Sequence, residues 1–225
     1  MEQKELNKIL ESHKRWLQGE DGKRADLYET DLRRADLIGA DLTGAILIGA
    51  DLAEANLTEA HLTGTFLARA NLAWADLRRA DLSWSDLSSA NLAETNLTWT
   101  DLGEANLTCA VLTRADLAGA DLRRANLRDA ELTGADLRFA VLTEVVGLSV
   151  LCVQVNTSHE NRRISYIPSL DVVTAGCFQG AFAEFEKRVE EKHKNNPFVL
   201  SRYRRVIAFL KREAEEDEKR LEQNG

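Results

Sequence analysis

The chain has 225 residues, of which 44% are hydrophobic and 29% are charged, and its formal net charge at pH 7 is −8. This balance suits one or two folded domains with a wet surface, and no basic stripe is present that would predict direct nucleic-acid binding. No segment approaches the roughly 18 uninterrupted apolar residues of a membrane-spanning helix, so we expect no membrane association.

The sequence contains few motifs that carry chemistry. Its three cysteines have no CxxC spacing and are predicted to be reduced thiols. The four histidines lie far apart and lack the spacing of metal ligands; they are His13, His61, His159 and His193. There is no phosphate-binding or dinucleotide-binding glycine motif and no GxSxG nucleophile motif. We therefore predict a protein that is not an enzyme and that holds no metal or cofactor.

The N-terminal segment, residues 1–24, is predicted to contain a capping helix over residues 3–18. Apolar and aromatic residues recur there with the i, i+3, i+4, i+7 spacing of an amphipathic helix, at Leu6, Ile9, Leu10, His13, Trp16 and Leu17. The segment lacks the apolar core of a signal peptide, so we expect a cytoplasmic location.

Residues 25–144 repeat every five residues. Leucine occupies every fifth position from Leu27 to Leu142, which makes 24 leucines, and Ala, Thr or Ser stands two places before each. Five is neither a helix period nor a strand period, but a chain that turns a corner every five residues closes a four-sided coil in about 20 residues. The pattern predicts a β-solenoid of about six coils with the leucines inside, in which neighbouring coils bury each other's core.

The motif A(D/N)LXX, seen in "ADLIGADLTGA" (35–45), resembles that of the pentapeptide-repeat proteins. The resemblance covers residues 25–144 and implies the right-handed quadrilateral β-helix of that family. The helical N-terminal leader is similar to those of bacterial and phage members. Asp or Asn is replaced in six frames, at an outward position where the core should tolerate the change: Ile46, His61, Phe66, Val111, Glu131 and Val141.

Residues 145–225 change in composition and predict a small α+β domain. Short strands are expected at 148–155, 163–167 and 171–175, and the turn-forming "NTSHEN" (156–161) separates the first two. Two helices should follow, one marked by Phe182, Phe185 and Val189 and the next by Tyr203, Val206, Ile207 and Leu210, with a break at "NNP" (195–197). The charged C-terminal stretch is interpreted as a solvated helix end.

The 20-residue coil allows surface residues to be mapped, because residues 20 apart stack. Two successive polar positions of one column have become apolar, at Ile46 and Phe66, and Ile48 lies on the same face. Trp84 stacks above Gly64 and is a diagonal neighbour of Phe66 across the corner. Clustering of exposed apolar residues is a mark of contact sites, so Ile46, Ile48, Phe66 and Trp84 form the candidate protein-binding patch.

Two further contacts are predicted along the columns. Arg79 lies directly under Trp99, which would allow a surface cation–π contact. The column Asn56, Asp76, Asn96, Asp116, Asp136 could hydrogen-bond from coil to coil, although either residue type also simply suits a corner.

Two classes of function are compatible with the sequence. The first is a non-enzymatic scaffold that binds a protein partner, or a second copy as a homodimer, through the solenoid surface and the C-terminal domain. The second follows from the resemblance, because some family members imitate duplex DNA and bind DNA gyrase or another type II topoisomerase. Residues 25–144 carry 20 carboxylates and 10 arginines, a net charge of −10; B-DNA of equal length, ~29 Å, would carry about 17 negative charges. The sequence favours the scaffold.

Overall fold

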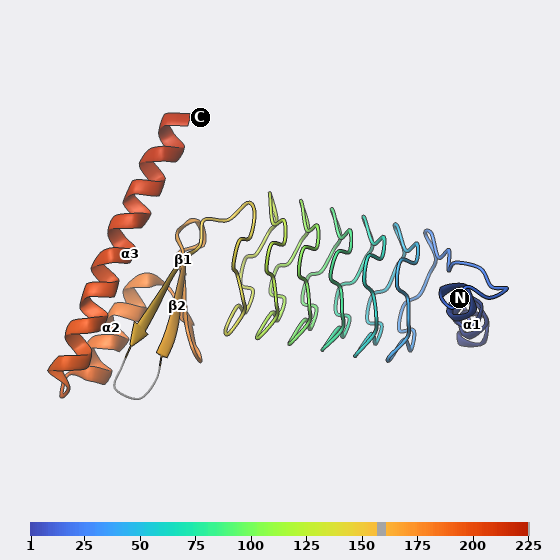
Figure 1. Cartoon of the computed structure of the whole chain (residues 1–225), viewed down its shortest axis with the longest axis horizontal. Helices are drawn as coiled ribbons and strands as arrows, with labels where there is room; N and C mark the ends of the chain where they lie inside the picture. Colours follow the sequence, from blue (N-terminus) through green and yellow to red (C-terminus); the bar gives the residue numbers. More distant parts are fainter. Residues whose placement is uncertain (157–160, 225) are drawn as a thin grey trace. The chain divides into compact units, whose positions relative to one another are not determined.

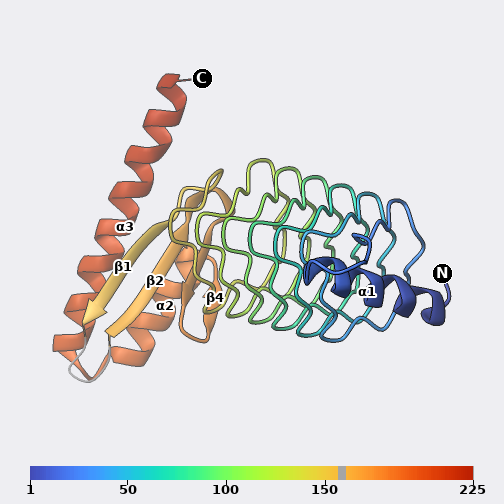
Figure 2. The same cartoon turned by 45° about the vertical axis from the view of Figure 1, so that its right-hand side comes forward.

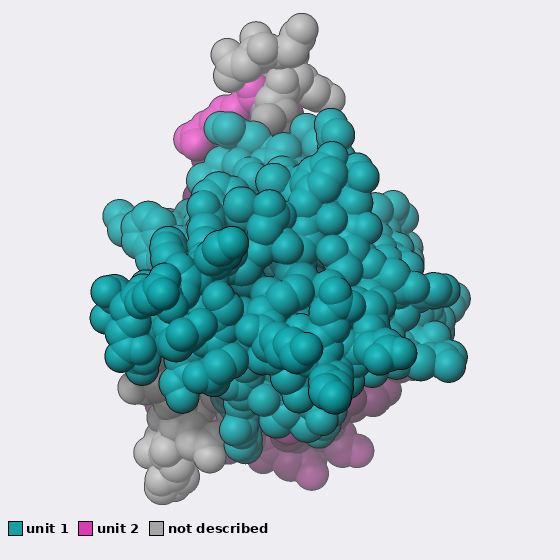
Figure 3. Space-filling view, turned by 90° about the vertical axis from the view of Figure 1, so that its right-hand side faces the viewer, with its two compact units in different colours: residues 1–147 teal, residues 148–225 magenta. Residues whose placement is uncertain are grey.

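A computed structural model describes residues 1–156 and 161–224, with side chains described outside 153–163 and 221–225. The predicted turn at "NTSHEN" therefore lies largely outside the described residues. The chain divides into two compact units, Met1–Gly147 and Leu148–Gly225, which Figure 3 colours teal and magenta. None of the helices in the described residues is long and apolar enough to cross a membrane.

The hydrogen bonds at the corner of each repeat explain why Asp or Asn precedes the leucine. The Asp or Asn before the leucine accepts a hydrogen bond from the backbone N–H two residues later, as at Asp31 and Arg33, where the Oδ1–N distance is 3.1 Å. The leucine carbonyl then accepts from the N–H three residues on, as in Leu32 and Ala35 at 3.0 Å. The second turn residue has positive φ, for example 59° at Arg34. Asp and Asn are favoured because their short side chains stabilise such turns.

Parallel bridges between residues 20 apart stack the coils, from Asp26↔Ile46 to Asn126↔Val146. Figure 1 shows the resulting row of coils, coloured from blue to yellow-green. All 24 repeat leucines are at most 5% exposed and fill the interior. The small residues before them are also mostly buried, and where these are buried Thr or Ser their hydroxyls donate to leucine carbonyls, as Thr95 does to Leu72 at 2.8 Å. The predicted inward and outward positions are confirmed.

The helix α1 (Gln3–Leu17) lies against the first coil, as Figure 2 shows. The Gln3 side-chain amide donates to the Asp36 carbonyl at 2.9 Å and accepts from the Asp36 N–H at 3.1 Å. The Gln3 side chain thus makes the two hydrogen bonds that the backbone of a preceding coil would make to Asp36. The N-terminal ammonium donates to the Asp31 carbonyl at 2.7 Å. Toward the other end of α1, His13 Nδ1 accepts from the Ala25 N–H at 3.1 Å. Leu6, in the first turn of the helix, is also buried.

The second unit contains a four-stranded antiparallel sheet in the order β1-β2-β3-β4. Its strands are β1 (Leu151–Asn156), β2 (Asn161–Ile167), β3 (Val172–Ala175) and β4 (Phe178–Gly180), with a short 3-10 helix η1 (Pro168–Leu170) after β2. The first three agree with the sequence prediction, whereas β4 was not predicted. It is only three residues long and follows a tight turn at Gly176, whose φ is 60°.

Two helices complete this unit, α2 (Phe182–His193) and α3 (Pro197–Asn224). The core between sheet and helices includes all of the predicted helix markers except Val206, which is partly buried at its edge. Asp171 Oδ1 accepts from the Phe182 N–H at 3.2 Å and so caps the start of α2. The charged C-terminal stretch remains helical to Asn224 and contains ion pairs such as Arg212–Glu213 at 3.1 Å.

Candidate protein-binding surface

The four residues of the candidate patch lie on the second and third coils. Ile46 and Phe66 are joined by a β-bridge, so their side chains project from neighbouring coils on the same face. Ile46 and Ile48 are half-buried, whereas Phe66 is 42% exposed and Trp84 is 64% exposed. Trp84 lies around the corner, and no ring contact joins it to Phe66 in the described residues. The structure therefore aligns three of the four residues and leaves the fourth on the adjoining face.

Arg24 is a part of this surface that the sequence analysis missed. Its Nε donates to the Gly44 carbonyl at 2.6 Å, and its guanidinium lies 5.0 Å from the Phe66 ring centroid and 6.0 Å from the Trp16 ring centroid. Gly44 is 20 residues after Arg24 and therefore stands in the same column one coil further on, and the long Arg24 side chain runs along this column. Trp16 is exposed at the end of α1, so the helix contributes directly to the patch.

Tyr28 is a second residue of this surface that the sequence analysis missed, although its 20-residue spacing from Ile48 could have identified it. It stands 20 residues before Ile48 and therefore stacks beneath it, and its side chain is 55% exposed. Gly44 and Gly64 keep the neighbouring corners bare, since a Cβ built at either would meet no atom within 4 Å. The extended patch thus comprises Trp16, Arg24, Tyr28, Ile46, Ile48, Phe66 and Trp84.

Trp99 does not make the predicted contact. Arg79 pairs instead with Glu59, with its Nη1 at 3.5 Å from Glu59 Oε1, and the described residues contain no cation–π pair between Arg79 and Trp99. The indole lies toward the following coil, where a Cβ at Gly119 would be 2.8 Å from its Cδ2 atom. Glycine leaves the room for this ring, which explains why the prediction was wrong.

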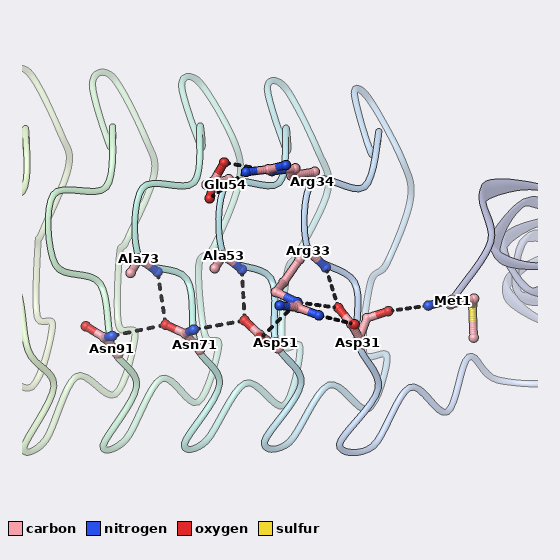
Figure 4. A network of polar contacts seen from close by, with 10 residues as sticks. All are labelled: Met1, Asp31, Arg33, Arg34, Asp51, Ala53, Glu54, Asn71, Ala73 and Asn91. Carbon is pink, nitrogen blue, oxygen red and sulfur yellow. Dashed lines mark hydrogen bonds and ion pairs between the residues drawn. The ribbon is translucent and has the colours of Figure 1, made fainter.

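Coil-to-coil side-chain hydrogen bonds occur, but in other columns than the one predicted. Asn71 Nδ2 donates to Asp51 Oδ1 at 2.8 Å, and Asn91 Nδ2 donates to Asn71 Oδ1 at 3.0 Å, as Figure 4 shows. A second such chain joins Asp86, Asn106 and Asn126. In the predicted column the Asp and Asn side chains bond within their own turns, as Asn56 does with Thr58 at 2.7 Å.

Most of the charge on the solenoid is locally paired. Eight of the ten arginines in residues 25–144 form ion pairs, either within one turn or with the neighbouring coil. Arg33 and Arg34 in Figure 4 represent the two types, with partners Asp31 and Glu54 at 2.7 and 2.8 Å. Hydrogen bonding to the Arg33 guanidinium holds the pKa of Asp31 well below its usual range, and Arg78 lowers the pKa of Asp76 similarly. Each pair interrupts the acidic surface.

The described residues contain no group of three or more His, Cys, Asp or Glu side chains arranged to hold a metal ion. All three cysteines are free and exposed. The pKa shifts on the solenoid arise mainly from the ion pairs and turn hydrogen bonds just described, which are structural in kind.

These features define a four-sided β-solenoid whose distinguishing surface is apolar and aromatic. A family model for pentapeptide repeats matches eight copies within residues 23–143, which is more than half of the chain. The chain belongs to the pentapeptide-repeat family, whose members form right-handed quadrilateral β-helices. A search of curated proteins finds no match.

Solved structures of the same family resemble the chain. HetL of the cyanobacterium Nostoc sp. strain PCC 7120, a pentapeptide-repeat protein involved in regulating heterocyst differentiation, is 34% identical over 56% of this chain and 67% of its own, with a TM-score of 0.47. Rfr23 of Cyanothece 51142 is 44% identical over 36% of this chain and 58% of its own, with a TM-score of 0.27. QnrB1, a plasmid-mediated fluoroquinolone resistance protein, is 18% identical over 55% and 76%, with a TM-score of 0.35.

Proposed function

We propose that the protein is a non-enzymatic scaffold that binds a protein partner through the extended patch on its first three coils. The observation that carries the proposal is the placement of Arg24 against Trp16 and Phe66 beside the half-buried isoleucines. Trp, Tyr and Arg are the residue types that dominate binding energy at protein interfaces. A guanidinium held against aromatic rings is pre-organised, so little further freedom is lost when a partner docks.

A double variant, Phe66→Asp with Trp84→Ser, tests the patch. Each lost aromatic anchor should weaken binding by about 2 kcal/mol, more than about tenfold. Folding should survive, because Asp86 follows in the same column and Ser89 adopts the φ of 57° that position 84 also requires. An aspartate at position 66 would also lie within reach of Arg24.

The matched control is Trp99→Ser, which removes an equally exposed indole from a different face. Pull-downs from a bacterial lysate and sedimentation velocity should show that the wild type and the control retain the same partners or the same self-association, while the double variant loses them. Equal retention by all three proteins would remove the patch from consideration and shift the binding site to residues 148–225.

Imitation of duplex DNA at a type II topoisomerase is the alternative function. A duplex mimic needs a continuous array of negative charge that stands in for phosphates. The ion pairs of the arginines on the solenoid neutralise that array at intervals, and the acidic residues left without a cation are distributed over its four sides. The charge pattern gives this alternative less support than the scaffold.

A further inference from the structure

A small hollow in the second unit combines an aromatic floor with a cationic rim. It has a volume of about 50 Å³ and is lined by residues of β3, β4, α2 and α3: Ala175, Phe178, Phe185, Arg188, Val189, Lys192, His193 and Tyr203. The hollow is too small for a nucleotide or a drug-sized molecule, since such ligands occupy pockets of roughly 300–1,000 Å³. It has room for one compact group.

The floor of the hollow is built from rings that contact one another at tilted, edge-to-face and stacked angles. The Phe178 and Phe185 ring centroids are 5.6 Å apart, and the Phe185 and Tyr203 centroids are 6.5 Å apart. The His193 imidazole lies nearly parallel to the Tyr203 ring, at 5.0 Å and 15°. These contacts fix the rings in place, so the apolar surface exists before any ligand arrives.

The rim carries cations without matching carboxylates. Arg188 lies with its guanidinium carbon 5.4 Å from the Phe178 centroid, and Lys192 follows one helical turn later. Where side chains are described, neither forms an ion pair, whereas nearby Glu190 and Glu186 are paired with Arg204 and Lys211, each at 2.7 Å. Like charges four residues apart on a helix repel each other. An anion between them would relieve that repulsion.

We propose that this hollow binds a carboxylate attached to a compact apolar body. The apolar part would rest on Phe178, Phe185 and Tyr203, and the carboxylate would accept hydrogen bonds from Arg188 and Lys192 at the rim. Such a group exists in short-chain free acids, for example propionate, and in the acidic side chain of a peptide. The site lies wholly within the second unit and is independent of the patch on the solenoid.

The test is a titration of the full chain followed by backbone amide NMR, with propionate as the free-acid probe and acetyl-Ala-Glu-Ala-amide as the peptide probe. Saturable shifts of the amides of Arg188, Val189, Lys192, His193 and Tyr203 with either probe support the proposal, and the responding probe identifies the source of the carboxylate. Propionamide, a neutral molecule of nearly the same shape as propionate, should give no saturable shift.

The variant for this test is Arg188→Gln with Lys192→Gln, which should raise the dissociation constant of the responding probe at least about tenfold because both charge-assisted hydrogen bonds are lost. Lys187→Gln with Arg205→Gln removes the same charge from exposed positions of α2 and α3 outside the hollow and should leave binding unchanged. The proposal is overturned if neither probe saturates, if propionamide binds as well as propionate, if inorganic phosphate displaces the responding probe and binds more tightly than that probe, or if the two double variants behave alike.

Discussion

His13 joins the N-terminal helix to the first repeat. It is fully buried, its ring stacks on Trp16 at 5.3 Å, and its Nδ1 atom accepts the Ala25 N–H. That hydrogen bond requires a neutral imidazole with the proton on Nε2. Protonation would place a hydrogen on Nδ1, facing the Ala25 N–H, and remove the acceptor, so the junction depends on the neutral form.

This dependence predicts weaker attachment of α1 in acid. Burial lowers the pKa of His13; Asp41 and the Thr43 carbonyl oppose this shift, and Arg24 adds to it. Because the folded pKa lies below the ordinary value of about 6.5, the stabilisation is fully present above about pH 6.5 and is lost as the pH falls through the lowered pKa. Hydrogen exchange of the α1 amides, corrected for intrinsic rates, should show less protection at about pH 5.5 than at about pH 7.5.

The variant His13→Gln separates the titration of His13 from the titration of other groups as the cause of the pH dependence. The glutamine side-chain carbonyl can accept from Ala25 but does not titrate, so His13→Gln should flatten the pH dependence of α1 protection. His61→Gln, which removes an exposed imidazole from the solenoid, should leave that dependence intact. The same slope in the wild type and in His13→Gln would show that another group controls the junction.

At the scale of the elements, the leucine columns hold the solenoid together. Leu87 lies in the middle of the stack and is fully buried between leucines of neighbouring coils. Leu87→Ala should lower the free energy of unfolding by roughly 2–5 kcal/mol, because the neighbouring coils cannot collapse into the cavity. Urea denaturation followed by far-ultraviolet circular dichroism measures the change.

The matched surface change is Arg78→Ala. Its guanidinium is paired with Asp76 at 2.6 Å, but both side chains are substantially exposed, and such pairs contribute only about 0–1 kcal/mol. Comparable losses at Leu87 and Arg78 would contradict the assignment of inward and outward positions.

The sequence predicted most elements well because their signals are local or strictly periodic. The five-residue period gave the coils, and the helical spacing of Leu6, Leu10 and Leu17 gave α1, whose observed end at Leu17 lies one residue before the predicted one. β4 escaped prediction because a three-residue strand has too few residues to show alternation. The direction of the Trp99 side chain also escaped, because it depends on whether space opens at Gly119 or at Arg79.

For the whole molecule, the charge pattern predicts the outcome of a DNA supercoiling assay. If the paired arginines break the acidic surface as described, micromolar protein should neither inhibit DNA gyrase nor protect it from a quinolone. Replacing Arg78, Arg123 and Arg124 with glutamine would make the solenoid more continuously acidic and provides the comparison. Inhibition or protection by the wild-type protein at that concentration would favour the duplex-mimic function over the scaffold.

The sequence by itself determined the solenoid, its inward leucines, the helical leader and the α+β character of residues 145–225, because each rests on a repeating or amphipathic pattern that only one arrangement buries. It also placed Ile46 and Phe66 side by side, since residues 20 apart must stack. Only the tertiary structure decided that Arg24 reaches over Phe66, that the Gln3 amide completes the first coil at Asp36, and that Arg188 and Lys192 rim an aromatic hollow. These contacts depend on the paths of long side chains and on packing between distant elements, which no period in the sequence encodes.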